Sequence, residues 1–151
     1  MSIRQEQALI FLDIDGVLDV FQPDVEIQYF LPEAIQYLKG LVTSASARIV
    51  VISSHRFGGK NWDILNEIFR ENDMTDIDVT PSGEKYGSRT EEIQAYLQCY
   101  PDVKRYVILD DCYQDDYSGD RQIQAHLVFV DALKGLQEKD IAEACRILGI
   151  Y

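Results

Sequence analysis

Four short apolar runs constrain the fold of this chain more than any other feature of its sequence. They are Ala8–Leu12, Ile49–Ile52, Tyr106–Leu109 and Leu127–Val130. Each run is continuous instead of alternating, rich in β-branched or aromatic residues and of strand length, which is typical of parallel strands covered on both faces. Ile77–Val79 is a weaker fifth candidate. The sequence therefore predicts a parallel sheet of about five strands.

Segments with the apolar period of helices separate these runs. They are Ala34–Val42, Trp62–Phe69, Ile93–Tyr100 and Ile141–Leu148. Ser88 and Glu91 form a predicted capping box at the start of the third helix. The order β-α-β-α-β-α-β-β-α is typical of a doubly wound, Rossmann-like α/β fold. Because the chain has 151 residues, 46% of them apolar, and neither linker nor repeat, we expect a single domain over residues 1–151.

The charge and cysteine content exclude several classes of partner. The chain carries 14 basic and 26 acidic residues, a net charge of -12, so we expect it to repel long nucleic-acid tracts. Its three cysteines form no CxxC pair, which predicts neither a zinc site nor a disulfide framework. The first apolar run is interrupted by Asp13 and is too short for a signal peptide or a membrane span. We therefore expect a soluble, cytoplasmic protein without membrane contact.

Acidic and hydroxyl side chains follow three of the predicted strands. The first strand runs into Asp13-Ile14-Asp15-Gly16, the second into Ser53-Ser54-His55-Arg56 and the fourth into Asp110-Asp111. The carboxyl ends of parallel strands meet at one edge of a sheet, where ligands bind. The loops Gly16–Phe30 and Cys112–Gln124 should border this edge. Clustered carboxylates repel one another and attract a hard cation, for which Mg²⁺ is the best match.

Asp13 and Asp15 fit the roles of nucleophile and acid/base in phosphoryl transfer. One carboxylate can attack phosphorus to give an aspartyl phosphate, while a second protonates the leaving oxygen and later activates water. Gly16 lets the chain turn sharply after them. Arg56 can clamp a phosphate bidentately. A lone aspartate at a strand end often only caps a turn, but that interpretation weakens when Asp13, Asp15 and Asp110 are taken together.

The sequence also resembles a known superfamily. Phe11–Leu18, which contains the DxDG, is similar to the first motif of the haloacid dehalogenase-like (HAD) superfamily, Ile49–Ser53 to the second and Val107–Asp111 to the fourth. The resemblance implies that Asp13 is the nucleophile and Asp15 the acid/base. It also implies that Ser53 hydrogen-bonds the phosphoryl group. The metal ligands implied for Mg²⁺ are the Asp13 carboxylate, the Asp15 main-chain carbonyl, Asp110 and Asp111.

A closer resemblance is to small HAD domains grouped with RNA-repair proteins. It lies in Ser53-Ser54-His55-Arg56 and in Arg89-Thr90-Glu91-Glu92-Ile93, whose spacing departs slightly from the pattern of those domains. The residues that we expect to bind the substrate phosphate are Ser53, Ser54, Arg56 and a basic residue of the third motif. Lys85 and Arg89 are both candidates for that basic residue. Lys85 is favoured, because lysine is usual in the superfamily.

The intervals between the motifs leave no room for a cap domain. The resemblance to capless members implies an exposed site for a phosphate monoester on a nucleotide, a nucleic-acid end or a phosphoprotein. The predicted function is a Mg²⁺-dependent HAD-like phosphatase, a phosphoric monoester hydrolase. One alternative is a catalytically weak HAD-like binding or regulatory module. A receiver-like phosphoacceptor domain fits less well, because receivers carry their phosphoacceptor on a later strand.

Overall fold

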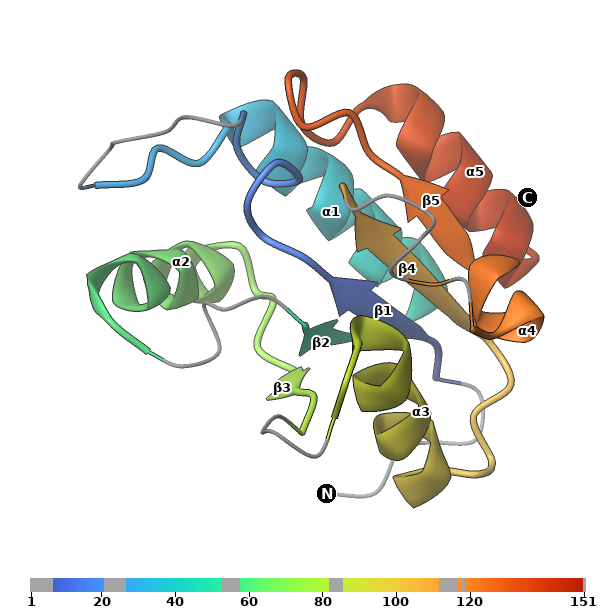
Figure 1. Cartoon of the computed structure of the whole chain (residues 1–151). Coiled ribbons are helices and arrows are strands. Elements are labelled where there is room, and N and C mark those ends of the chain that lie inside the picture. Colours follow the sequence, from blue (N-terminus) through green and yellow to red (C-terminus); the bar gives the residue numbers. More distant parts are fainter. Residues whose placement is uncertain are drawn as a thin grey trace.

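The structure is a computed structural model, and it describes residues 7–20, 27–52, 58–81, 86–111, 117 and 119–150. Within these ranges, five strands form an all-parallel sheet in the order β3-β2-β1-β4-β5 (Figure 1). The strands are β1 (Leu9–Leu12), β2 (Arg48–Val51), β3 (Ile77–Val79), β4 (Tyr106–Asp110) and β5 (Leu127–Phe129). The predicted doubly wound parallel sheet is confirmed.

The strands lie where the apolar runs predicted them, with ends that differ by about one residue. β2 begins at Arg48 instead of Ile49, because the Arg48 N–H already donates to the Ala8 carbonyl at 2.9 Å. At the other end, Ile52 lies outside β2, although its N–H still donates to the Leu12 carbonyl at 3.0 Å. β4 extends one residue further than predicted and includes Asp110.

Successive strand residues fill two apolar cores, one on each face of the sheet. One core contains Ile10, Leu12, Ile49, Val51, Val107 and Leu109. The other contains Leu9, Phe11, Val50, Ile52, Tyr106 and Ile108. All of these side chains are buried, so neither face of the central strands meets water. The continuous apolar runs in the sequence follow from this double coverage.

Helices cover both faces of the sheet. The first core is closed by α1 (Pro32–Ala45), α2 (Lys60–Glu71) and α5 (Glu138–Leu148). The second is closed by α3 (Arg89–Cys99) and the short α4 (Arg121–Gln124). Figure 1 shows α1 and α5 on one side of the sheet and α3 on the other. Within the described ranges, each crossover contains one helix, and no cap is inserted between the strands.

Two details of the helices differ from the prediction. The Ser88 hydroxyl accepts a hydrogen bond from the Glu91 N–H at 3.2 Å, as a capping box requires, but the Glu91 carboxylate accepts from the N–H of Gly87. The prediction of an irregular stretch up to Gln124 was wrong at its end, because α4 begins at Arg121. The Asp120 carboxylate caps α4 by accepting from the N–H groups of Gln122 and Ile123.

The order of the strands places a switch point between β1 and β4. From β1 the chain moves outward through β2 to β3, and then returns to the other side of β1 to form β4 and β5. In open α/β sheets, ligands bind beyond the carboxyl ends of the strands at such a point. Within the described residues, no helix is long and apolar enough to span a membrane.

Candidate active site

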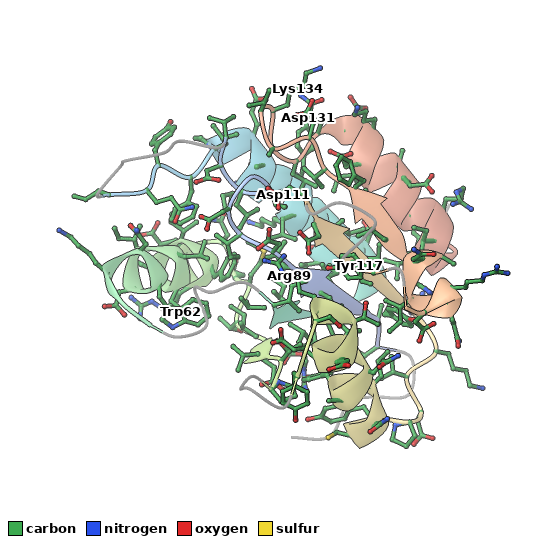
Figure 2. All side chains as sticks on the ribbon, in the orientation of Figure 1. Trp62, Arg89, Asp111, Tyr117, Asp131 and Lys134 are labelled. Atoms are coloured by element: carbon green, nitrogen blue, oxygen red, sulfur yellow. The ribbon has the colours of Figure 1, made fainter. Side chains whose placement is uncertain are left out.

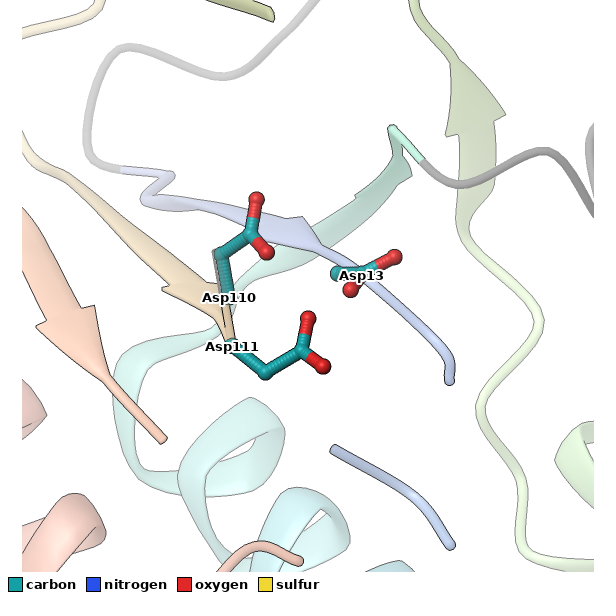
Figure 3. A group of neighbouring side chains, drawn as sticks. All are labelled: Asp13, Asp110 and Asp111. Atoms are coloured by element: carbon teal, nitrogen blue, oxygen red, sulfur yellow. The ribbon is translucent and has the colours of Figure 1, made fainter. Parts of the chain in front are cut away.

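Three aspartates meet at the switch point. Asp13 follows β1, and Asp110 and Asp111 lie at the end of β4 (Figure 3). The parallel register pairs Leu12 with Leu109, and the Asp13 N–H donates to the Leu109 carbonyl at 2.9 Å. One carboxylate oxygen from each aspartate lies within 4.8 Å of the others. The backbone pairing of β1 with β4 therefore brings together acids that are almost 100 residues apart.

Asp13 and Asp110 face the α3 side of the sheet. They continue the alternation of Phe11 and Ile108, whose side chains belong to the core beneath α3. From the first turn of α3, Nη1 of Arg89 lies 2.6 Å from Oδ2 of Asp110 and 3.5 Å from Oδ2 of Asp13. Arg89 therefore neutralises part of the negative charge at the end of both strands. Figure 2 shows Arg89 and Tyr117 on the same side of the sheet as α3.

Tyr117 provides a second donor to Asp110. Its side chain is fully buried, and its hydroxyl donates to the same Oδ2 atom that Arg89 contacts. Sequence reasoning missed this residue, although it lies in the loop that was predicted to border the site. No sequence pattern indicates which group a tyrosine hydroxyl will contact. The predicted position of its loop beside the site was therefore the only signal for Tyr117.

Gly16 gives the third carboxylate room. The residue has a φ of +79°, and a Cβ atom placed on it would lie 2.3 Å from Oδ2 of Asp111. A side chain at this position would displace the Asp111 carboxylate or the turn, and few residues other than glycine adopt that φ, so glycine is favoured here. The predicted sharp turn after Asp15 therefore also determines how closely the chain can approach Asp111.

The gathered acids hold protons tightly. The pKa of Asp13 is raised from its ordinary value of 3.8 to about 9, chiefly by burial and then by Asp110 and Asp111, while Arg89 acts to lower it. Burial also raises the pKa of Asp111. An all-oxygen set of carboxylates whose ionisation is costly fits a hard divalent cation, because the cation offsets the repulsion between them. Asp13, Asp110 and Asp111 are therefore the residues that could hold such a metal.

Asp15 lies outside the group of three carboxylates. Its side chain is exposed, and Oδ1 accepts a hydrogen bond of 2.6 Å from the Gln28 side-chain amide. The same amide nitrogen donates to Oδ2 of Asp19 at 2.5 Å. A metal contact through the main-chain carbonyl of Asp15 stays a prediction. Gln28 and Asp19 were not named as site residues, although both lie in the loop Gly16–Phe30 that was expected to border the site.

Of the other predicted phosphate ligands, the structure describes only Arg89. Ser53, Ser54, Arg56 and Lys85 lie outside the described residues, so their roles stay predictions. Of the two third-motif candidates, Arg89 is described, and it contacts both Asp13 and Asp110. Sequence alone favoured Lys85 over Arg89.

Fold and site together define a class of protein: a HAD-like α/β core, with no cap in the described part of the chain and with clustered aspartates at the carboxyl ends of β1 and β4. Comparison with protein families gives the particular family. The chain belongs to the family described as "HAD domain in Swiss Army Knife RNA repair proteins", which matches residues 9–141. The match spans all five strands and all three clustered aspartates. It supports a function of HAD phosphohydrolase type. Neither a curated protein nor a solved structure matches the chain.

Proposed function

We propose that the chain is a Mg²⁺-dependent phosphohydrolase that cleaves an exposed phosphate monoester through an aspartyl phosphate on Asp13. The observation that carries this proposal is the position of Asp13. Asp13 directly follows β1, and its buried carboxylate lies beside Asp110 and Asp111 and faces the Arg89 guanidinium. This arrangement fits attack on a phosphate dianion, because the neighbouring acids can hold a divalent cation, and that cation and the guanidinium both offset the negative charge of the phosphate.

Asp13, Asp110 and Asp111 would hold Mg²⁺, joined by the Asp15 main-chain carbonyl in the arrangement that the HAD resemblance implies. When bound, the cation offsets the negative charge of the carboxylates and of the substrate phosphate. Arg89 acts in the same direction, since it already lowers the pKa of Asp13. Both effects favour the ionised Asp13 that can attack phosphorus.

In the first step, a carboxylate oxygen of Asp13 forms a bond to phosphorus, and the bond from phosphorus to the ester oxygen breaks. The electron pair of that bond stays on the leaving oxygen. Asp15, in its protonated form, transfers its proton to this oxygen, so that a neutral alcohol leaves. The products are an aspartyl phosphate on Asp13 and an ionised Asp15.

In the second step, water attacks the phosphorus of the aspartyl phosphate. Asp15 accepts a proton from the water as the new oxygen–phosphorus bond forms. The bond between phosphorus and the Asp13 oxygen breaks, which regenerates the Asp13 carboxylate and releases inorganic phosphate. Asp15 is then protonated again for the next cycle.

The substrate we propose is a phosphate that protrudes from a larger molecule, with the end of a nucleic-acid strand as the first choice. Two observations support it. The crossovers in the described part of the chain contain no cap, and the family takes its description from RNA-repair proteins. The net charge of -12 argues for contact with a short end instead of a long tract.

The test is turnover of p-nitrophenyl phosphate with Mg²⁺ and with a chelator, for the wild type and for Asp13→Asn. We expect activity only with the metal, and a loss of at least about a thousandfold in the variant. Asp73→Asn is the matched control, because Asp73 is exposed and its φ of 61° suits asparagine. Metal-independent turnover, or full activity of Asp13→Asn, would overturn the mechanism.

A panel of phosphorylated oligonucleotides, nucleotides, phosphopeptides and sugar phosphates then identifies the substrate class. Capture of beryllium fluoride by the ionised Asp13, without turnover on any member of the panel, would identify a HAD-like binding or regulatory module instead.

A further inference from the structure

Gln28, in the segment that precedes α1, contacts Asp15 of the candidate site. This side chain is half-buried, and its Nε2 atom lies 2.6 Å from Oδ1 of Asp15 and 2.5 Å from Oδ2 of Asp19. Both partners are carboxylates, and a carboxylate accepts hydrogen bonds, so the amide nitrogen must donate to each of them. The orientation of the Gln28 amide is therefore fixed by its neighbours.

The Asp19 end of this bridge is anchored in the interior. Asp19 is buried, and its Oδ1 atom accepts from the N–H of Gly16 at 2.7 Å. A chain of hydrogen bonds therefore connects Gly16 to Asp19, Asp19 to Gln28 and Gln28 to Asp15. Because Asp15 and Gly16 are adjacent in the turn after Asp13, both ends of this chain lie in the same turn. Asp15, which is exposed, is thereby tied to a buried group.

The backbone around Gln28 is held from two sides. The Gln28 N–H donates to Oδ1 of Asn61 in the first turn of α2, at 3.0 Å. Three residues later, the Leu31 N–H donates to the Leu18 carbonyl at 2.8 Å. These contacts keep the Gln28 side chain over the turn instead of leaving it on a free loop.

We propose that Gln28 is a positioning residue, which holds the Asp15 carboxylate in the orientation required for proton transfer. This inference rests on the proposed function, in which Asp15 is the acid/base. An exposed carboxylate otherwise samples several rotamers, and a proton donor misplaced by about 1 Å can cost about a hundredfold in rate. The amide acts through Asp15, and it carries no proton to the substrate itself.

The experiment is a double-mutant cycle of Gln28→Leu and Asp15→Asn, measured as kcat/KM with Mg²⁺. If Gln28 acts through Asp15, Gln28→Leu lowers kcat/KM by about 10- to 100-fold in the wild type. It then has an effect of less than about twofold in the Asp15→Asn background, where no acid remains to be positioned. A merely structural role would give the same loss in both backgrounds.

The leaving group provides a second readout. Protonation matters most for a poor leaving group, so the loss in Gln28→Leu should be larger for phenyl phosphate than for p-nitrophenyl phosphate. Gln36→Leu is the matched control, because Gln36 donates a similar amide hydrogen bond to Asn72, away from the site. We expect wild-type kcat/KM from it on both substrates.

A less disruptive variant guards against a folding defect. Asn61→Leu removes the acceptor of the Gln28 N–H while keeping the amide, and should give a smaller loss with the same dependence on the leaving group. Equal losses in both Asp15 backgrounds, or equal losses on both substrates, would overturn the role of Gln28 alone. A wild type without Asp13-dependent turnover would overturn the proposed function, and this inference with it.

Discussion

At the scale of single residues, Asp110 is the best-held acid of the site. Its Oδ2 atom receives the Arg89 guanidinium at 2.6 Å and the buried Tyr117 hydroxyl. Groups that hydrogen-bond a metal-ligating carboxylate fix its orientation and tune its affinity for the metal. Tyr117 is therefore expected to act on metal binding without touching the substrate.

Tyr117→Phe should weaken Mg²⁺ binding by about 10- to 100-fold, because the variant keeps the ring but loses the hydroxyl that orients Asp110. Calorimetric titration with Mg²⁺ measures this directly. Tyr100→Phe is the control, since the Tyr100 ring packs against Tyr96 and Arg48 at the opposite edge of the sheet. Equal Mg²⁺ affinities for the wild type and Tyr117→Phe would show that Arg89 alone is sufficient to orient Asp110.

Asp13 makes stability depend on pH when no divalent cation is bound. Burial, with help from Asp110 and Asp111, raises its pKa from 3.8 to about 9. Between these two values the folded protein holds a proton that the unfolded chain has lost. The free energy of unfolding therefore falls as the pH rises through this window. The stabilising contribution of protonated Asp13 is complete below the lower value and lost above the higher one.

Asp13→Asn should remove this dependence, because asparagine does not ionise. In a chelator, we expect the variant to gain stability relative to the wild type, on the order of 2 kcal/mol, as the pH rises from about 5 to about 8. Thermal or urea denaturation at several pH values measures it. Mg²⁺ should restore the wild type and leave the variant unchanged, while Asp73→Asn should follow the wild type. Parallel pH profiles of the wild type and Asp13→Asn would contradict the raised pKa.

At the scale of secondary-structure elements, the turn after β1 determines whether the site can form. Gly16 has a φ of +79°, and its missing side chain leaves space for Asp111. Gly16→Ala should therefore displace Asp111 or the turn, with a loss of about 1–3 kcal/mol in stability and of Mg²⁺ affinity. Thermal denaturation and Mg²⁺ titration test both effects.

Gly40→Ala is the matched control for Gly16. Gly40 lies inside α1, and a Cβ atom there would meet nothing within 4 Å. The same substitution should stabilise the protein by about 0.5–1 kcal/mol, because alanine restricts the unfolded chain and favours the helix. A Gly16→Ala variant with wild-type Mg²⁺ affinity would show that the turn can adapt to the added methyl group.

The strands were predictable from sequence because their burial is encoded locally. Both faces of β1, β2 and β4 are covered, so each strand is a continuous apolar run that needs no knowledge of its neighbours. The short α4 was missed, because four residues are too few to show a helical period. Its one local signal was Asp120, a residue type that favours the N-cap of a helix.

The site was predictable only where it follows the strands. Asp13, Asp110 and Asp111 end β1 and β4, so a parallel sheet was enough to bring them together. Tyr117 and Gln28 reach the site from loops, and their partners depend on how those loops cross the sheet. The sequence pattern does not say how these loops cross the sheet. The contacts that Arg89, Tyr117 and Gln28 make with the aspartates were therefore found only in the structure.

At the scale of the whole molecule, the two ends of the strands differ in how their charged side chains are compensated. At the amino end of β2, buried Arg48 forms an ion pair of 3.0 Å with Asp76, and its guanidinium lies over the Tyr100 ring. This charge is compensated by a permanent partner. At the carboxyl ends of β1 and β4, the clustered acids outnumber the Arg89 charge that faces them among the described residues, an arrangement that fits a divalent cation. The compensated ion pair and the clustered acids thus lie at opposite ends of the strands.

The net charge of -12 predicts an unusual dependence on salt. A basic nucleic-acid enzyme loses affinity as salt rises, because it binds by displacing counterions. Here the acidic surface repels the extra phosphates of an oligonucleotide, and salt screens that repulsion. Between about 20 and about 200 mM salt, kcat/KM for a phosphorylated oligonucleotide should therefore rise by about two- to tenfold. Turnover of p-nitrophenyl phosphate, which carries no such chain, is the control and should change less. A steep fall with the oligonucleotide would instead locate a basic path for nucleic acid beside the site.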